Sequence, residues 1–290
     1  MLALILSCCS VKRIAINSLG KALSEGSSAF ANDDDPELVR DAAPFALKAI
    51  ESLIEQSPRN QGLLTAACSG FTEYSYAFVQ QPADFIEAQD LARAAEMRAR
   101  AKKLYLRAVD YGMRGLEVAL PGFRDQLRGN PDAALAKATV KQVPLLYYTA
   151  GAWAASFAID VSDSELSLNQ TRIEKMMTRA LALDENWGLG ALHDFFITWE
   201  AGHASAGGSM QRAREHYLRA RELAAGKRVV PLVTYAESVL IAQQKKQEFE
   251  AVLNEALQFD SGKAPPEQKL ANVLGQRRAR WLLSRIDELF

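Results

Sequence analysis

The chain has 290 residues, of which 49% are hydrophobic, so it can form a substantial packed core and is not a disordered protein. Its 34 basic and 35 acidic side chains leave a formal net charge of −1, so no overall field steers it toward nucleic acid or an anionic membrane. Helix formers dominate and β-branched residues are sparse, which predicts an all-α fold. No stretch reaches the roughly 18–20 uninterrupted apolar residues that a membrane-spanning helix needs.

The first ten residues, MLALILSCCS, read as a processing segment rather than the start of a domain. Residues 5–8, ILSC, fit the lipobox that precedes the acylated cysteine of bacterial lipoproteins, and residues 6–9, LSCC, fit it less well. The cationic start of a signal peptide is missing and the apolar run is short, so a hydrophobic end with two idle thiols is the alternative. We expect a leader over residues 1–9 with Cys8 or Cys9 acylated, and a tether over residues 10–35.

From residue 36 onward, apolar residues recur with helical periodicity between clusters of Pro, Gly, Asn and Asp, which predicts one helical domain over residues 36–290. The acidic run DDDP at residues 33–36 suits the start of its first helix, because carboxylates favour the positive end of the helix dipole. Polar clusters at residues 54–58 and 181–187 are typical of the ends of helical repeats.

Four segments share a large apolar residue that is followed three positions later by alanine. They are Tyr105 to Ala108, Met177 to Ala180, Tyr217 to Ala220 and Leu253 to Ala256. Their alanines lie 72, 40 and 36 positions apart, close to two, one and one units of the roughly 34-residue tetratricopeptide repeat. Alanine lets neighbouring helices approach closely, so the pattern predicts a right-handed superhelix of tetratricopeptide-like helix pairs. An ordinary helical bundle with alanine-rich seams is the alternative.

The sequence offers little that indicates catalysis or cofactor binding. Residues 18–21, SLGK, match the SxxK motif, but they lie in the predicted tether, where nothing would hold a nucleophile against a base. The three histidines, His193, His203 and His216, do not have the i, i+4 spacing of a helical zinc site. No glycine-rich phosphate loop and no nucleophile elbow occur. We therefore expect neither an enzyme nor a bound metal or cofactor, and Cys68, inside an apolar helical pattern, is expected to be a small core residue.

Two basic runs invite comparison with nucleic-acid-binding proteins. The first extends from Arg93 to Arg107, and the second contains Arg277, Arg278, Arg280 and Arg285. Acidic residues interleave the first run and no aromatic stacking platform accompanies it, so we interpret both runs as solvated helix faces and expect no nucleic-acid partner.

Aromatic residues are dense on three predicted helices. Most must belong to the core, but Tyr, Trp and His also carry polar atoms that can meet a ligand on the concave face of a repeat superhelix. The residues predicted to bind a ligand or partner are Tyr74, Tyr148, Trp153, Trp187, His193 and Phe196.

Several stretches resemble the T-component family of tripartite ATP-independent periplasmic (TRAP) transporters, often called TatT. They are CSVKR (9–13), NSLG (17–20), DDDPELVR (33–40), AACSGFTEY (66–74), YAFV (76–79), LYLRA (104–108), YG (111–112), PLLY (144–147) with Trp153, GALH (190–193), FFI (195–197), TYAES (234–238), AN (271–272) and QRRARW (276–281). The resemblance covers nearly the whole chain. It aligns Cys9 as the acylated residue, whereas spacing to the apolar run favours Cys8, and both stay open.

The resemblance implies a lipid-anchored periplasmic protein, attached to the outer membrane, that oligomerises as a trimer. It also implies association with the solute-binding protein of a TRAP system, whose substrates are small organic acids or similar solutes. On this hypothesis the chain docks the binding protein and binds an organic-acid or hydrophobic ligand. The competing hypothesis is a structural tetratricopeptide adaptor of the cell envelope that binds no ligand.

Overall fold

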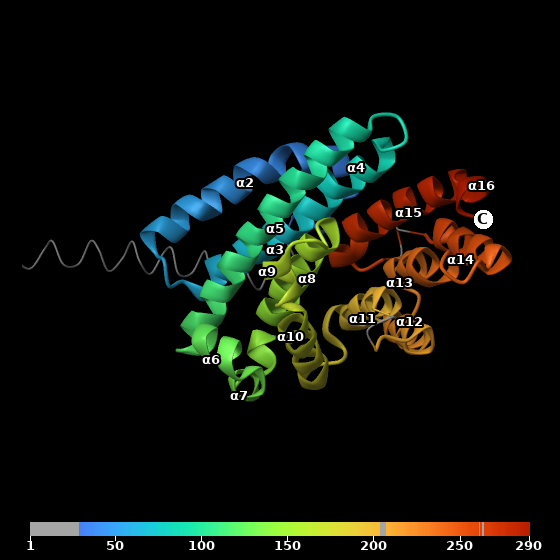
Figure 1. The fold of residues 1–290 in the computed structure, drawn as a ribbon. Helices are drawn as coiled ribbons and strands as arrows, with labels where there is room; N and C mark the ends of the chain where they lie inside the picture. Colours follow the sequence, from blue (N-terminus) through green and yellow to red (C-terminus); the bar gives the residue numbers. More distant parts are fainter. Residues whose placement is uncertain (1–28, 204–206, 261, 263) are drawn as a thin grey trace, which may run out of the picture. The chain divides into compact units, whose positions relative to one another are not determined.

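The computed structural model describes residues 29–203, 207–260, 262 and 264–290, and every regular element within these ranges is a helix (Figure 1). The predicted all-α fold is therefore confirmed. Contacts divide the chain into two compact units: the described part of unit 1 is Arg40–Leu183, and unit 2 comprises residues 29–39 and 184–290. Cys8, Cys9, the predicted leader and residues 10–28 of the predicted tether lie outside the described residues. The single domain over residues 36–290 and the right-handed superhelix stay predictions.

Unit 1 consists of long helices joined by short turns. Its α-helices are α2 (Pro36–Gln56, of which residues 36–39 group with unit 2), α3 (Gln61–Ser75), α4 (Gln81–Ile86), α5 (Leu91–Ala119), α6 (Phe123–Gly129), α7 (Pro131–Ala136), α8 (Val143–Ile159), α9 (Ser164–Ser167) and α10 (Gln170–Leu183). A π-helical segment, η1 (Tyr76–Gln80), joins α3 to α4, and a 3₁₀ turn, η2 (Val140–Gln142), precedes α8. The predicted helix ends within residues 54–58 and 181–187 are confirmed, since α2 ends at Gln56 and α10 at Leu183.

Several helices of this unit are capped at their N-termini by side chains that are adjacent in the sequence. Asp35 Oδ1 accepts hydrogen bonds from the backbone N–H groups of Glu37 and Leu38, both at 3.0 Å, which confirms that the acidic run starts a helix. Asn60 and Asp90 accept in the same way at the first turns of α3 and α5. Each cap satisfies a backbone donor that has no partner inside its own helix.

Small residues bring α5 against both α3 and α8 in unit 1. A Cβ atom at Gly112 of α5 would lie 2.0 Å from Thr149 Oγ1 on α8 and 2.8 Å from Cys68 Sγ on α3. Cys68 is a free, fully buried thiol, as predicted, and burial raises its pKa to about 12. These helices therefore touch at atoms that leave no room for a larger side chain at Gly112.

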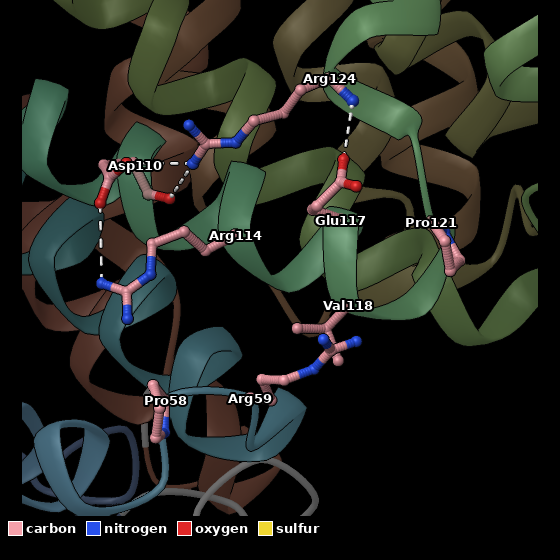
Figure 2. A pocket seen from close by; sticks show the side chains of 8 residues that line it. All are labelled: Pro58, Arg59, Asp110, Arg114, Glu117, Val118, Pro121 and Arg124. Carbon is pink, nitrogen blue, oxygen red and sulfur yellow. Dashed lines mark hydrogen bonds and ion pairs between the residues drawn. The ribbon is translucent and has the colours of Figure 1, made fainter.

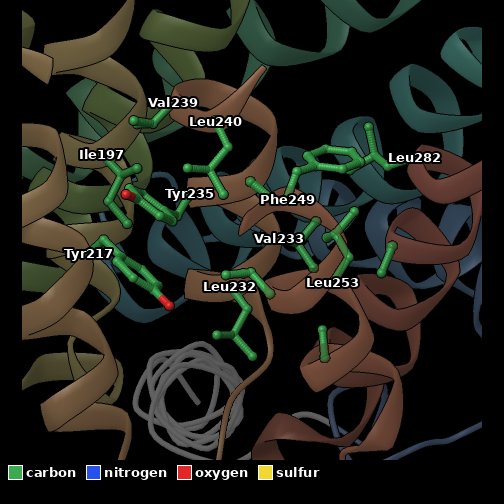
Figure 3. Packing of buried hydrophobic residues seen from close by; sticks show 14 of the residues in the cluster. Ile197, Tyr217, Leu232, Val233, Tyr235, Val239, Leu240, Phe249, Leu253 and Leu282 are labelled. Carbon is green, nitrogen blue, oxygen red and sulfur yellow. The ribbon is translucent and has the colours of Figure 1, made fainter. Parts of the chain in front are cut away.

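Unit 2 contains the remaining helices. They are η3 (Trp187–Leu189), α11 (Ala191–Gly202), α12 (Met210–Ala224), α13 (Val230–Tyr235), the π-helical η5 (Ala236–Leu240), α14 (Lys246–Gln258), η7 (Pro266–Gln268), α15 (Lys269–Ser284) and α16 (Ile286–Leu289). Their core is apolar and aromatic (Figure 3). The rings of Tyr217 and Tyr235 stack with centroids 4.0 Å apart, and Phe249, Leu253 and Leu282 complete the packing.

The alanines of the sequence repeat are packing positions, as predicted. Ala108, Ala180, Ala220 and Ala256 are all fully buried. The large residues three positions earlier, Tyr105, Met177, Tyr217 and Leu253, are buried as well. The recurring pattern therefore marks the buried face of four helices, α5, α10, α12 and α14.

The basic runs are largely ion-paired. Arg98 contacts Asp84 and Glu87, at 2.8 and 2.6 Å respectively. Arg278 contradicts the prediction of a solvated face in the second run: it is buried, it pairs with Glu237, and its guanidinium lies 4.3 Å from the ring centroid of Trp281. A carboxylate and an aromatic face together compensate for taking this cation out of water.

Candidate functional site

Three of the six predicted binding residues lie in unit 1. Tyr74 is on α3, and Tyr148 and Trp153 are on α8. Tyr74 and Trp153 are partly buried and pack against the hydrophobic core of this unit. Tyr148 is partly buried too, and its hydroxyl donates a hydrogen bond to Glu73 Oε1 at 2.7 Å. The prediction thus identified aromatic residues at the margin of the core.

The contact between Tyr148 and Glu73 combines a phenol with a carboxylate. Glu73 is exposed to solvent on one side, but neighbouring protein atoms displace water from its carboxylate, and this desolvation raises its pKa. The hydrogen bond from Tyr148 offsets part of that rise. Burial and then the charge of Glu73 raise the pKa of Tyr148 well above its usual value. The phenol therefore keeps its proton at neutral pH and serves as the donor.

The other three predicted residues lie in unit 2. Trp187 opens η3, and α11 carries His193 and Phe196. On α12, His216 faces both α11 residues: its ring lies against Phe196 with centroids 4.9 Å apart, and its Nδ1 is 2.8 Å from Nδ1 of His193. The structure brings His193 and Phe196 together through a residue that the sequence did not single out as a binding residue.

The His193–His216 pair is the end of a longer polar chain. Arg219 donates two hydrogen bonds to Glu185, from Nε to Oε1 at 2.8 Å and from Nη2 to Oε2 at 2.7 Å. Glu185 Oε1 lies 3.1 Å from His193 Nε2. The arginine first, together with the histidine, lowers the pKa of Glu185 to about 2. Glu185 is therefore a carboxylate at neutral pH and can only accept hydrogen bonds.

This carboxylate determines which histidine nitrogens carry protons. Burial lowers the pKa of His193 and lowers that of His216 to about 4, so both rings are neutral at pH 7. Because Glu185 accepts, His193 carries its hydrogen on Nε2 and accepts at Nδ1. His216 must then donate from Nδ1. Its Nε2 is left as a lone pair, with no hydrogen-bond partner among the described residues.

The six predicted residues therefore divide into two groups of three, one in each unit, and His193 and Phe196 share contacts with His216. Sequence reasoning missed Glu73, Glu185, His216 and Arg219, which supply the polar contacts of these groups. His193 and His216 are 23 positions apart, so no helical spacing relates them. The alanine pattern could have provided a signal, because it predicts which face of α12 packs against a neighbouring helix. Aligning that face with α11 would have placed the two histidines opposite each other.

An open pocket of about 510 Å³ lies elsewhere in unit 1 (Figure 2). None of the six predicted residues lines it. Its wall is formed by the turn between α2 and α3, the C-terminal half of α5 and the start of α6. The lining residues are Pro58, Arg59, Asp110, Arg114, Glu117, Val118, Pro121 and Arg124.

The polar residues of this pocket are arranged around two carboxylates. Arg124 Nη2 donates to Asp110 Oδ1 at 3.0 Å, while Arg114 Nη1 lies 3.7 Å from Asp110 Oδ2 (Figure 2). Glu117 accepts the backbone N–H groups of Gly122 at 2.7 Å and Arg124 at 3.0 Å. Those hydrogen bonds, that of Arg124 first, lower the pKa of Glu117, so it is ionised and caps the start of α6.

The pocket also escaped sequence analysis, although a signal for it exists. Asp110, Arg114, Glu117 and Val118 have the i, i+4, i+7, i+8 spacing of one helix face. The basic run considered in the sequence ended at Arg107, about one helical turn before Asp110, the first α5 residue that lines the pocket. Arg59 follows the helix break at Pro58, and only the packing of α2 and α3 against α5 brings it to this face.

Two further properties concern the described part of the chain. No group of three or more His, Cys, Asp or Glu side chains there converges in a way that could hold a metal ion. None of the helices described is both long and apolar enough to cross a membrane.

Comparison with known proteins now assigns the family. The family model described as "TRAP transporter T-component" matches residues 32–290, which includes nearly all described residues of both units. An uncharacterized protein from Treponema pallidum (strain Nichols) is 30% identical over 301 aligned positions, which cover 97% of this chain and 93% of that protein. This chain belongs to the family of TRAP transporter T-components.

Proposed function

We propose that this protein is a lipid-anchored, non-enzymatic accessory subunit of a TRAP transporter, which docks the solute-binding protein and binds a small organic-acid ligand. The observation that carries the proposal is the match to the T-component family over residues 32–290, because it covers the helices of both units rather than an isolated motif. A purely structural adaptor is less favoured, since the matched family is defined by its place in a transporter.

The surface of α2 supports a docking role. Leu38 and Phe45 are seven positions apart, two turns along one face of this helix. Their relative exposures are 58% and 82%, large values for apolar side chains. Exposed apolar residues on one face are typical of protein-interaction surfaces. This surface is suited to the binding protein or to another copy of the chain.

The docking proposal is tested by affinity capture from envelope extract. The tagged full-length chain should retain the solute-binding protein of a TRAP system of the same organism in near-stoichiometric amount. The variant Phe45→Ser should retain less of it, whereas Thr65→Ser, a conservative change on α3, should retain as much as the wild type. Recovery of the chain without any TRAP solute-binding protein would contradict the proposal.

Membrane attachment and assembly are tested separately. Replacing both Cys8 and Cys9 with serine should move the protein from the membrane to the supernatant fraction, and each single variant should show which cysteine is acylated. Light scattering of the released double variant should give three times the mass of one chain if the protein is a trimer. Sedimentation of the double variant with membranes would contradict the lipid anchor.

A further inference from the structure

We propose that the pocket between the α2–α3 turn and α5 in unit 1 binds a small monocarboxylate with an apolar body, held by Arg59 and Arg114. The assignment deepens the proposed function and rests on it for the role of the ligand. The binding site itself is argued from the pocket's unused donors, its charge and its apolar wall.

Unused hydrogen-bond donors are the first argument. Arg59 makes no ion pair or hydrogen bond through its side chain with any part of the chain that the structure describes. Arg114 Nη1 lies 3.7 Å from Asp110 Oδ2, which is too far for a hydrogen bond. The Arg114 guanidinium lies 5.2 Å from the ring centroid of Tyr111. Arg124, by contrast, is held by Asp110. Two of the three guanidinium groups are therefore available to a ligand.

The charge of the lining selects the charge of the ligand. Three arginines face two carboxylates, Asp110 and Glu117, which leaves one net positive charge in the pocket. Backbone N–H groups keep Glu117 ionised, and Asp110 forms an ion pair with Arg124 at 3.0 Å. A ligand with one negative charge neutralises the pocket, whereas a dianion such as phosphate would be repelled by both carboxylates.

The shape of the donors selects a carboxylate. A guanidinium presents parallel N–H groups that match the two oxygens of a carboxylate, which gives bidentate hydrogen bonds. Pro58, Val118 and Pro121 supply the apolar part of the wall, and Figure 2 places the Arg59 side chain beside Val118. A cavity of about 510 Å³ lies within the usual range of small-molecule sites. A short branched-chain acid fits all three features.

The proposal is tested by isothermal titration calorimetry on the purified full-length protein. Isovalerate is the probe, and isovaleramide, which has the same body without the charge, is its matched control. Inorganic phosphate and succinate test whether a dianion binds instead. We expect isovalerate to bind with one site per chain, isovaleramide to bind at least about tenfold more weakly, and both dianions to bind more weakly than isovalerate.

Variants test the assignment to particular residues. Arg59→Gln and Arg114→Gln should each weaken isovalerate binding about ten- to hundredfold, because each removes charged hydrogen bonds. Arg128→Gln is the matched control, since Arg128 is an exposed arginine of the same unit that pairs with Asp125 outside the pocket. Its affinity should equal that of the wild type. The Arg59 side chain has no ion pair or hydrogen bond to lose among the described residues, so its variant should melt at the wild-type temperature.

Four results would overturn the proposal: absence of binding at millimolar isovalerate, equal affinity for isovaleramide, tighter binding of phosphate or succinate, or unchanged affinity in both pocket variants. The same variants separate this inference from the proposed function. Capture of the TRAP solute-binding protein by Arg59→Gln at the wild-type level, together with lost isovalerate binding, would support the pocket and keep docking intact. Failure of capture by the wild-type protein would instead contradict the proposed function.

Discussion

The two units bury polar groups in different ways. In unit 1 the buried carboxylate Glu51 is hydrogen-bonded by Lys48 at 2.6 Å and by Tyr111 at 2.6 Å, and it pairs with Arg107 at 2.7 Å. The side chains of Lys48 and Arg107 are 68% and 45% exposed, so both cations keep much of their hydration. Burial alone would raise the pKa of Glu51, but these partners lower it below its usual value.

In unit 2 an entire ion pair is buried. Arg228, in the turn between α12 and α13, donates to Asp194 on α11 and to the backbone oxygen of Leu189 at 3.1 Å. The side chains of Arg228 and Asp194 are only 5% and 9% exposed. Burial raises the pKa of Asp194, and the charge of Arg228 offsets part of that rise.

The turns of the two units differ in the same way. In unit 1, the side chains of Asn60 and Asp90 each accept a hydrogen bond from the backbone N–H group three residues later, at the start of the helix that follows. In unit 2, Asn272 of α15 accepts the backbone N–H of Val229 at 2.9 Å and donates to the oxygen of Lys227 at 3.0 Å, more than 40 positions away in the chain. At these turns unit 2 uses a side chain far away in the sequence, whereas unit 1 uses side chains three residues away.

The largest expected effect comes from breaking the buried ion pair. Arg228→Met should lower the free energy of unfolding by about 3–5 kcal/mol, because it leaves Asp194 as an unpaired buried carboxylate. Adding Asp194→Leu should recover part of this loss, since both charges are then gone. The comparison variant in unit 1, Glu51→Gln, should cost less, because its cationic partners reach water. Urea unfolding followed by circular dichroism measures all three, and equal losses for Arg228→Met and Glu51→Gln would refute the comparison.

The next effect tests the tight packing of unit 1. Gly112→Ala should lower the free energy of unfolding by about 1–3 kcal/mol, since its Cβ would overlap Thr149 Oγ1 and crowd Cys68 Sγ. Gly129→Ala is the matched control in α6, where nothing lies within 4 Å of the new Cβ. It should be neutral or stabilising by up to about 1 kcal/mol, because alanine favours the helix. Thermal unfolding separates the two, and a loss of similar size in both variants would argue against close packing at Gly112.

The His193–His216 pair makes the stability of unit 2 depend on pH. The folded pKa of His216, about 4, is below its ordinary value of 6.5, so the unfolded chain binds more protons between these pH values. Stability from this residue is therefore present above about pH 6.5 and is lost as the pH falls toward 4. Glu200, Glu215 and Arg212 face His216 as well, with effects of both signs on its pKa.

His216→Phe isolates this contribution. The phenyl ring can keep the stack on Phe196 but cannot titrate, so the stability advantage of the wild type over the variant should shrink between pH 7 and pH 4.5. The raised pKa of Asp194 acts with the opposite sign, but it is common to both proteins and cancels in the difference. Urea midpoints at the two pH values provide the measurement. A constant difference would show that the pair does not titrate as inferred.

The smallest effect is expected at exposed ion pairs in either unit. Arg221 pairs with Glu255 in unit 2 at 2.6 Å, and both side chains are about half exposed, at 50% and 46%. Arg221→Gln should change the free energy of unfolding by about 0.2–1 kcal/mol, and this change should vanish in high salt. Arg128→Gln in unit 1 should behave alike. A loss above about 2 kcal/mol for either variant would mean that exposure does not decide the energy of these pairs.

The sequence by itself determined the helices and the positions at which they pack. Helical periodicity and caps such as Asp35 are local, and the recurring alanines Ala108, Ala180, Ala220 and Ala256 mark seams that are fully buried. These features depend on residues a few positions apart, so spacing alone reveals them. The same reasoning identified Tyr148 and His193 as unusual, although their binding role stays a proposal.

Only the tertiary structure decided which polar groups meet. His193 finds His216 and Glu185, Arg228 finds Asp194, and Arg59 comes beside Val118 of α5, each through helices or turns that are separate in the chain. Arg278 shows the limit most clearly, because the local pattern predicted a solvated cation and the structure buries it on Glu237 and Trp281. The physical reason is that a polar side chain's partner depends on which helix face arrives opposite it, and no local periodicity encodes that.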